Sequence, residues 1–172
     1  ATITVAPQPN IEVQDLTECE NSVGGNQAQF DLTSAVTWDI GTPAYSSNGT
    51  TITSPENYTG TDNEVITLTV TSDDECVTTE TFTLHVDPKP SCSIAGASSI
   101  CPSSLENIYS GADEDGMTYS WSISGDASIN GLTTGQTVLV DADAICGGSF
   151  ILELTTTKNG CSSTCSIEVV VQ

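Results

Sequence analysis

The sequence has almost no positive charge. It contains two lysines, no arginine and 23 acidic residues, which give a formal net charge of −21. A chain without a basic patch cannot displace counterions from phosphates, so nucleic acid is excluded as a partner. The same balance excludes attraction to an anionic membrane surface.

Long apolar runs and aromatic side chains are also scarce. No apolar run approaches the length that spans a membrane, so the sequence predicts no membrane insertion. Aromatic residues make up 5% of the chain and there is one histidine, so the aromatic-lined cleft of a glycosidase and Ser–His–Asp catalysis both lack support. We therefore expect no enzyme activity. The chain is still 37% hydrophobic, which is typical of a globular protein.

Large apolar residues alternate with serines in Tyr119–Gly125. A period of two predicts a strand with one buried face, with Trp121 at the centre of a core. A weaker copy stands at Val36–Gly41, and it contains Trp38. These two tryptophans, which are the only ones in the chain, are each expected to anchor one domain.

Two Pro-x-Pro motifs follow alternating segments. The strand-like residues 1–6 run into Pro7–Pro9, and the strand-like 83–86 run into Pro88–Pro90. Proline stiffens a linker and cannot donate to a sheet, so both motifs predict domain junctions. We expect a first domain over 1–88, whose residues 1–6 belong to it or to a preceding repeat, and a second over 89–172. The abrupt start favours a piece of a longer polypeptide.

Three landmarks repeat at nearly constant separation. They lie 82, 83 and 85 positions apart, which indicates a duplicated domain. Many short alternating segments with turn signals, and no helical period, predict an all-β fold of two tandem immunoglobulin-like β-sandwiches. The three pairs are Cys19 with Cys101, Trp38 with Trp121, and Cys76 with Cys161.

Seven cysteines in a chain of this composition predict disulfides and an extracellular, oxidising environment. Cys19 and Cys76 would pair if both are oxidised within the first domain, although a sandwich places their loops at opposite ends. In the second domain, Cys92 begins the first strand and Cys165 lies in the last, so these two are expected to pair. Two alternatives stay open for Cys101, which are Cys146 and Cys161.

Two pairs of aspartates are candidates for a calcium site. Asp113 and Asp115 precede the Trp121 strand, and Asp141 and Asp143 follow the strand that ends at residue 140. Calcium takes six to eight oxygen ligands, and carboxylates two residues apart in a loop can supply several. The alternative is that both loops are simply solvated. Ca²⁺ is the one cofactor that the sequence suggests.

The chain resembles tandem PKD-like, immunoglobulin-like repeats of very large Bacteroidota surface proteins. The motifs that carry the resemblance are Cys92–Gly96, Ile100–Ser103, Tyr119–Gly125 and Asn159–Cys165, with a weaker match at Trp38–Gly41. Flavobacterial gliding-motility adhesins of the SprB type are the members of this group that it suggests first. The motifs contain no catalytic residue.

Two functions follow from the resemblance. The first is a non-catalytic stalk or adhesive segment of a secreted cell-surface adhesin, outside the bacterial outer membrane, with neighbouring repeats and a polysaccharide or abiotic substratum as partners. The second is an accessory carbohydrate-binding or spacer module of a secreted polysaccharide-degrading enzyme. Exposed aromatic residues aligned on one sheet would favour the second.

Overall fold

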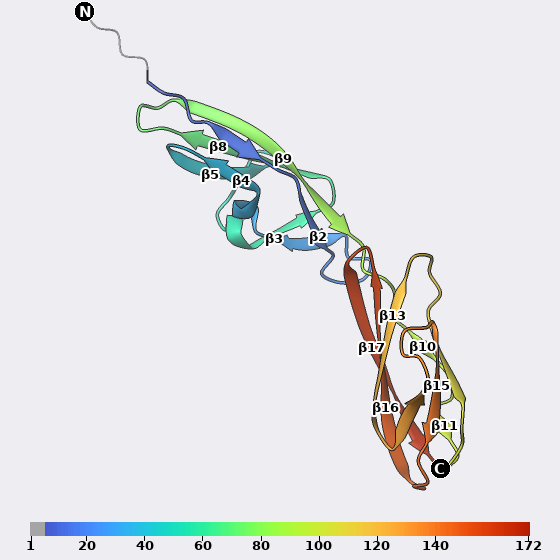
Figure 1. The fold of residues 1–172 in the computed structure, drawn as a ribbon. Helices are drawn as coiled ribbons and strands as arrows, with labels where there is room; N and C mark the ends of the chain where they lie inside the picture. Colours follow the sequence, from blue (N-terminus) through green and yellow to red (C-terminus); the bar gives the residue numbers. More distant parts are fainter. Residues whose placement is uncertain (1–5) are drawn as a thin grey trace, which may run out of the picture. The chain divides into compact units, whose positions relative to one another are not determined.

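The structure, a computed structural model, describes residues 6–172. The chain divides between Pro88 and Lys89 into two compact units, here called unit 1 and unit 2 (Figure 1). The division falls within the predicted Pro88–Pro90 junction. Residues 1–5 of the strand expected over 1–6 lie outside the described part of the chain.

Unit 2 is a sandwich of two four-stranded sheets. One sheet has the order β10-β12-β15-β14 and the other β11-β17-β16-β13. In chain order this is the ABED and A′GFC arrangement of immunoglobulin domains, so the predicted fold class is confirmed. The strands are β10 (Ile94–Ala95), β11 (Ser99–Ile100), β12 (Asn107–Gly111), β13 (Thr118–Gly125), β14 (Ala127–Asn130), β15 (Thr137–Ala142), β16 (Gly148–Lys158) and β17 (Cys161–Val171).

Trp121 lies in the core of unit 2. Its side chain is 4% exposed, and β13 places it opposite Leu154 of β16. The indole Nε1 donates to the carbonyl of Gly135 at 2.8 Å, so its polar atom is satisfied. Tyr109 of β12 and Phe150 of β16 meet edge to face with ring centroids 6.3 Å apart. The alternation in Tyr119–Gly125 therefore corresponds to the side chains that face this core.

Unit 1 has the same plan with one sheet divided. A five-stranded sheet has the order β2-β9-β8-β5-β6, and two separate pairs, β1-β4 and β3-β7, form the other layer. The 3₁₀ turn η1 (Leu32–Ala35) interrupts what is strand B in unit 2, which separates β3 from β4. The strands are β1 (Ile11–Val13), β2 (Leu16–Cys19), β3 (Gln27–Phe30), β4 (Val36–Trp38), β5 (Thr42–Ser47), β6 (Thr50–Ile52), β7 (Tyr58–Thr61), β8 (Glu64–Thr71) and β9 (Val77–Asp87), with a second 3₁₀ turn, η2 (Pro55–Asn57), before β7.

The prediction that Trp38 anchors the first core is wrong. Trp38 ends β4 and is 38% exposed, whereas Tyr45 of β5 is 4% exposed and lies opposite Leu68 of β8. Tyr45 therefore holds the position in unit 1 that Trp121 holds in unit 2. The two tryptophans are 83 residues apart in sequence but occupy different strands of the fold.

The segment between Gly41 and Gly60, which the sequence leaves without a regular pattern, forms β5, β6 and most of β7. Asn48 and Gly49 make a two-residue turn with φ of 48° and 78°, as the Asn-Gly signal predicts. At Gly60 a Cβ atom would stand 2.4 Å from the side chain of Leu84. A larger residue at this position would force the buried side chain of Leu84 in β9 to shift.

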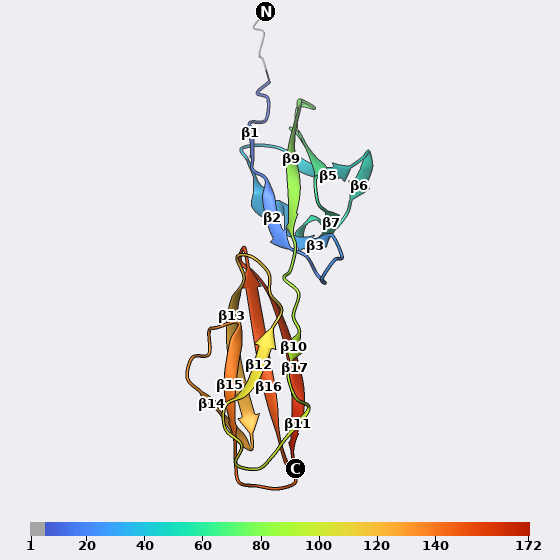
Figure 2. The same ribbon diagram turned by 90° about the vertical axis from the view of Figure 1, so that its right-hand side faces the viewer.

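In each unit, the sheet that contains the unit's last strand has its own first strand parallel to that last strand. Leu16 to Cys19 of β2 lie opposite Leu84 to Asp87 of β9, and Ile100 of β11 lies opposite Val171 of β17. Figure 2 shows β2 beside β9. The chain thus enters and leaves each sheet on neighbouring strands that point in the same direction.

Candidate functional site

The segment that leads into unit 2 is covalently bonded to its last strand. Cys92 and Cys165 form a disulfide with Cα atoms 5.7 Å apart, across 73 sequence positions. Cys165 faces inward from β17 together with Ile167, and both side chains pack against the core of unit 2. This is the pair that the neighbouring first and last strands of an immunoglobulin-like domain suggest.

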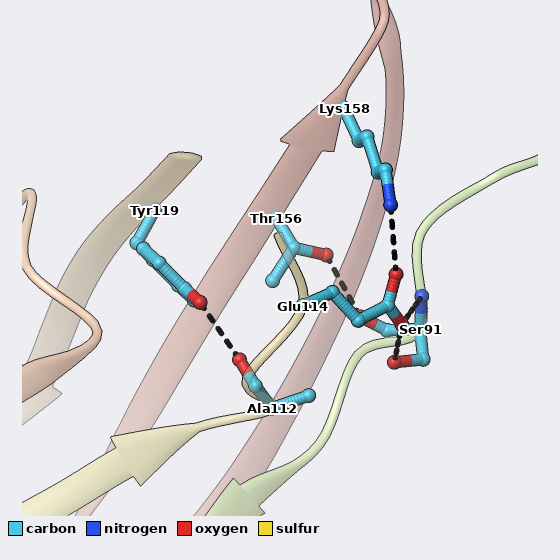
Figure 3. Close-up of polar contacts among 6 residues, drawn as sticks. All are labelled: Ser91, Ala112, Glu114, Tyr119, Thr156 and Lys158. Atoms are coloured by element: carbon cyan, nitrogen blue, oxygen red, sulfur yellow. Dashed lines mark hydrogen bonds and ion pairs between the residues drawn. The ribbon is translucent and has the colours of Figure 1, made fainter. Parts of the chain in front are cut away.

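Hydrogen bonds hold the residue before the disulfide. The hydroxyl of Ser91 donates to Glu114 Oε1 at 2.5 Å, and Thr156 Oγ1 donates to the carbonyl of Ser91 at 3.1 Å. Thr156 is fully buried in β16. Figure 3 shows these contacts converging on Ser91 from the β12–β13 loop and from β16. The entry segment is therefore fixed on two sides.

An ion pair completes the group. Lys158 Nζ lies 3.7 Å from Glu114 Oε2, with both side chains about one-third exposed. The hydrogen bond from the Ser91 hydroxyl is the main cause that lowers the pKa of Glu114, and the charge of Lys158 adds to it. An exposed pair of this kind contributes little to stability, so its value is in positioning the loop. The six residues, here called the entry clamp, are Ser91, Cys92, Glu114, Thr156, Lys158 and Cys165.

The entry clamp joins residues that are far apart in the sequence. It connects the chain at the start of unit 2 to the final strand through a covalent bond. Sequence reasoning identified the two cysteines. It did not identify the polar members, because Ser91 is separated by 23 residues from Glu114 and by 65 from Thr156, and no local pattern connects them.

The other predicted cysteine pairs do not form. Cys76, Cys101 and Cys146 are free thiols, so neither Cys19–Cys76 nor the alternatives for Cys101 exist in the structure. The physical reason for Cys76 is distance along β9. Cys76 precedes the first residue of this 11-residue strand, and Cys19 lies opposite its last residue, so about 35 Å separates them at 3.3 Å per residue.

The four aspartates proposed as calcium ligands are not gathered into a site. Within residues 6–172, no group of three or more His, Cys, Asp or Glu side chains is placed to hold a metal ion. Asp141 uses both carboxylate oxygens inside the fold, accepting from the Glu106 N–H at 2.7 Å and from Asn130 Nδ2 at 3.0 Å. Its role is to hold the β11–β12 loop against β15.

The aromatic residues are not aligned on an exposed sheet. Tyr45 and Tyr109 are buried in the two cores. Tyr58 lines an open hollow of about 460 Å³ beside the β5–β6 hairpin, but its hydroxyl donates to Glu64. Trp38 lies at a neighbouring hollow of about 450 Å³ with Pro43 and Ile52. The arrangement lacks the row of stacking side chains that would favour polysaccharide binding.

Glu64 is expected to make unit 1 sensitive to acid. Burial alone would raise the pKa of Glu64, but donors from Ser47, Tyr58 and the Thr61 N–H together hold this pKa below its usual 4.5. A carboxyl group with a lowered folded-state pKa adds stability above its unfolded pKa and loses it as the pH falls through the folded value. We expect the free energy of unfolding of unit 1 to fall as pH drops below about 4.5.

Urea unfolding followed between pH 6 and pH 3 measures this effect. Glu64→Gln should lower stability at pH 6 and flatten the dependence on pH, because glutamine has no charge to lose. The matched control is Glu56→Gln, at an exposed position in η2. An unchanged slope in Glu64→Gln would contradict the prediction.

No protein-family model and no curated protein matches the chain. Among solved structures, it is similar to the titin domains Z1Z2 in complex with telethonin, with 15% identity over 98% of both chains and a TM-score of 0.38. It is also similar to the titin Ig tandem A164–A165, with 11% identity over 95% of this chain and 96% of that one and a TM-score of 0.31.

A third similar structure is a Parabacteroides merdae β-glucuronidase, with 12% identity over 97% of this chain but 25% of the enzyme and a TM-score of 0.33. All three TM-scores lie below 0.5, so the immunoglobulin-like assignment rests on the strand order within each unit. No helix among residues 6–172 is long and apolar enough to cross a membrane.

Proposed function

We propose that the chain is a non-catalytic, load-bearing segment of a secreted bacterial cell-surface adhesin. The observation that carries this proposal is the disulfide between the entry segment and the last strand of unit 2. Neither of the two hollows beside the β5–β6 hairpin includes Cys92 or Cys165 in its lining. The disulfide matters when the two ends of the unit are pulled apart.

Tension across unit 2 has a short covalent route. A force applied before Ser91 and after Val171 passes from Cys92 through the disulfide to Cys165 and along the end of β17. The intervening 73 positions lie outside that route. At about 3.5 Å per residue, the disulfide withholds about 250 Å of chain from extension. Unit 2 therefore stays short even if its sheets open.

The strand order of unit 1 suits the same role. Because β2 and β9 are parallel and carry the chain in and out, opposite forces on its ends slide one strand along the other. The four residue pairs from Leu16–Leu84 to Cys19–Asp87 are then loaded together. Hydrogen bonds loaded together resist a force better than bonds opened one at a time.

The resemblance to repeats of Bacteroidota surface proteins suggests where this load would arise. In a gliding-motility adhesin, the load would act between a moving cell and the substratum or polysaccharide that it grips. Disulfides and the near absence of lysine agree with an extracellular location. The net charge of −21 keeps neighbouring chains apart on a crowded surface.

Single-molecule force spectroscopy tests the proposal. Handles are attached to the full chain at position 89 and at Gln172, and the extension at unfolding is measured. We expect the wild-type chain to lengthen by about 40 Å, which is the reach of the residues outside the disulfide loop. The double variant Cys92→Ser, Cys165→Ser should lengthen by about 250 Å more.

The control is the double variant Cys101→Ser, Cys146→Ser, which removes two free thiols and should extend like the wild type. If the wild-type chain instead lengthens as far as the Cys92→Ser, Cys165→Ser variant at a similar force, the disulfide bears no load. The load-bearing role would then be abandoned.

A further inference from the structure

Each unit has a cysteine at each of two opposite ends. In unit 1, Cys19 ends β2 beside the last residue of β9, and Cys76 precedes the first residue of β9. In unit 2, Cys101 follows β11 beside the last residue of β17, and Cys161 is the first residue of β17. Cys19 and Cys101 are thus equivalent positions, and so are Cys76 and Cys161.

The two end cysteines of a unit, Cys19 and Cys76 in unit 1 or Cys101 and Cys161 in unit 2, cannot bond to each other. Both β9 and β17 are 11 residues long, so each separates its two cysteines by about 35 Å. A disulfide requires Cα atoms about 4.4–6.8 Å apart. A cysteine at each end of a unit is instead suited to bonds with units that precede and follow it.

One member of each equivalent pair is free. Cys76 is a free, half-buried thiol at the tip of the β8–β9 hairpin, and Cys101 is a free, exposed thiol after β11. Their counterparts Cys161 and Cys19 are both held in disulfides. Cysteines at both positions can therefore form disulfides in this fold. The two that remain free are Cys76, directly before β9, and Cys101, directly after β11.

We propose that Cys76 and Cys101 are the two halves of a head-to-tail disulfide between successive units of this kind. The thiol after β11 of one copy bonds to the hairpin thiol before β9 of the next copy. This inference rests on the proposed load-bearing role, because a disulfide between copies would carry a load from one copy to the next. It supplies the partner, which is another immunoglobulin-like unit with the same cysteine positions.

The bond forms by thiol–disulfide exchange. The Cys101 thiolate attacks a disulfide oxidant such as oxidised glutathione and releases one reduced glutathione. The Cys76 thiolate then attacks the mixed disulfide and releases the second. Two thiols become one disulfide, and the oxidant takes up the two electrons and two protons. Each copy has a charge of −21, so copies repel one another. A covalent bond can hold two copies together against this repulsion, whereas weak contacts could not.

The test uses the full chain with Cys146→Ser as the background, which removes the third free thiol. Incubation with oxidised glutathione at physiological salt or above, where charge repulsion is screened, should give a ladder of dimers, trimers and longer species on a non-reducing gel. Adding Cys76→Ser or Cys101→Ser should end the ladder at dimers, because each chain then has one thiol.

Mixing these two single-thiol variants gives the decisive comparison. We expect the heterodimer to exceed either homodimer about tenfold, because surfaces that fit raise the effective concentration of the two thiols. Peptide mapping by mass spectrometry should find Cys76 joined to Cys101. Homodimers as abundant as the heterodimer, or no dimer at all, would overturn the inference. Either result leaves the outcome of the pulling experiment unaffected.

Discussion

Trp121→Ala is expected to lower the free energy of unfolding of unit 2 by about 3–5 kcal/mol. The side chain is 4% exposed and packs opposite Leu154. Its removal loses the transfer energy of the largest side chain in the core and leaves a cavity that rigid neighbours cannot fill. It also leaves the carbonyl of Gly135 without the indole donor that lies 2.8 Å away.

Two matched variants separate this effect from the general cost of losing an aromatic residue. Trp38→Ala should cost about 1 kcal/mol, because this tryptophan is 38% exposed. Tyr45→Ala should cost about 3–5 kcal/mol in unit 1, since Tyr45 has the equivalent core position. Urea unfolding followed by far-UV circular dichroism measures all three. Equal losses for Trp38→Ala and Trp121→Ala would show that the two tryptophans are equivalent after all.

Loss of the disulfide is the second large effect. The double variant Cys92→Ser, Cys165→Ser opens a loop of 73 positions, and the entropy released to the unfolded chain corresponds to about 4 kcal/mol. For a unit of this size we expect the midpoint of thermal unfolding to fall by about 20 °C. Scanning calorimetry of the chain with and without a reductant gives a second measure of the same quantity.

Cys101→Ser with Cys146→Ser is the control for this prediction too. Both thiols are exposed and free, so their replacement should change stability by less than about 0.5 kcal/mol. If the control variant lost as much stability as the disulfide variant, the effect would come from serine itself and not from the broken bond.

The strands of unit 2 are predictable because their side chains alternate cleanly. In β13 and β17 every second residue faces inward, and the sequence shows that period directly. In unit 1 the same reasoning assigns the core to Trp38, because a large residue in a short alternating segment resembles the Trp121 strand. Alternation tells which side chains share a face. It does not tell which strand pairs with which, and Trp38 belongs to β4, which pairs with β1 at the edge.

Tyr45 is a core residue that the sequence pattern does not reveal. Its strand contains Pro43, which lacks a backbone donor, and small polar residues, so the segment has no strand pattern. Burial of Tyr45 follows from its neighbours on β8, which are distant in sequence. Its hydroxyl even lacks a hydrogen-bond partner within the described chain. Tertiary packing determines that Tyr45 is buried, and the local sequence does not predict it.

The cysteine pairs also differ in how well the sequence predicts them. Cys92 is expected to begin the first strand of its domain but lies two residues before β10, whereas Cys165 lies in the last strand, β17. Their pairing is still accessible, because the first and last strands of an immunoglobulin-like sandwich commonly run side by side. The conditional pair Cys19–Cys76 does not form, because the length of β9 keeps the two cysteines at the opposite ends where a sandwich places their loops. The polar members of the entry clamp come from three separate stretches of chain, so only the folded structure brings them together.

The disulfide between Cys92 and Cys165 also bears on damage by extracellular proteases. A backbone cut at any point between these residues would leave the two pieces of unit 2 joined through sulfur. One of the two lysines of the chain, Lys158, lies inside that interval. A trypsin-like enzyme that cleaved after Lys158 would nick the backbone of unit 2 without separating the two pieces.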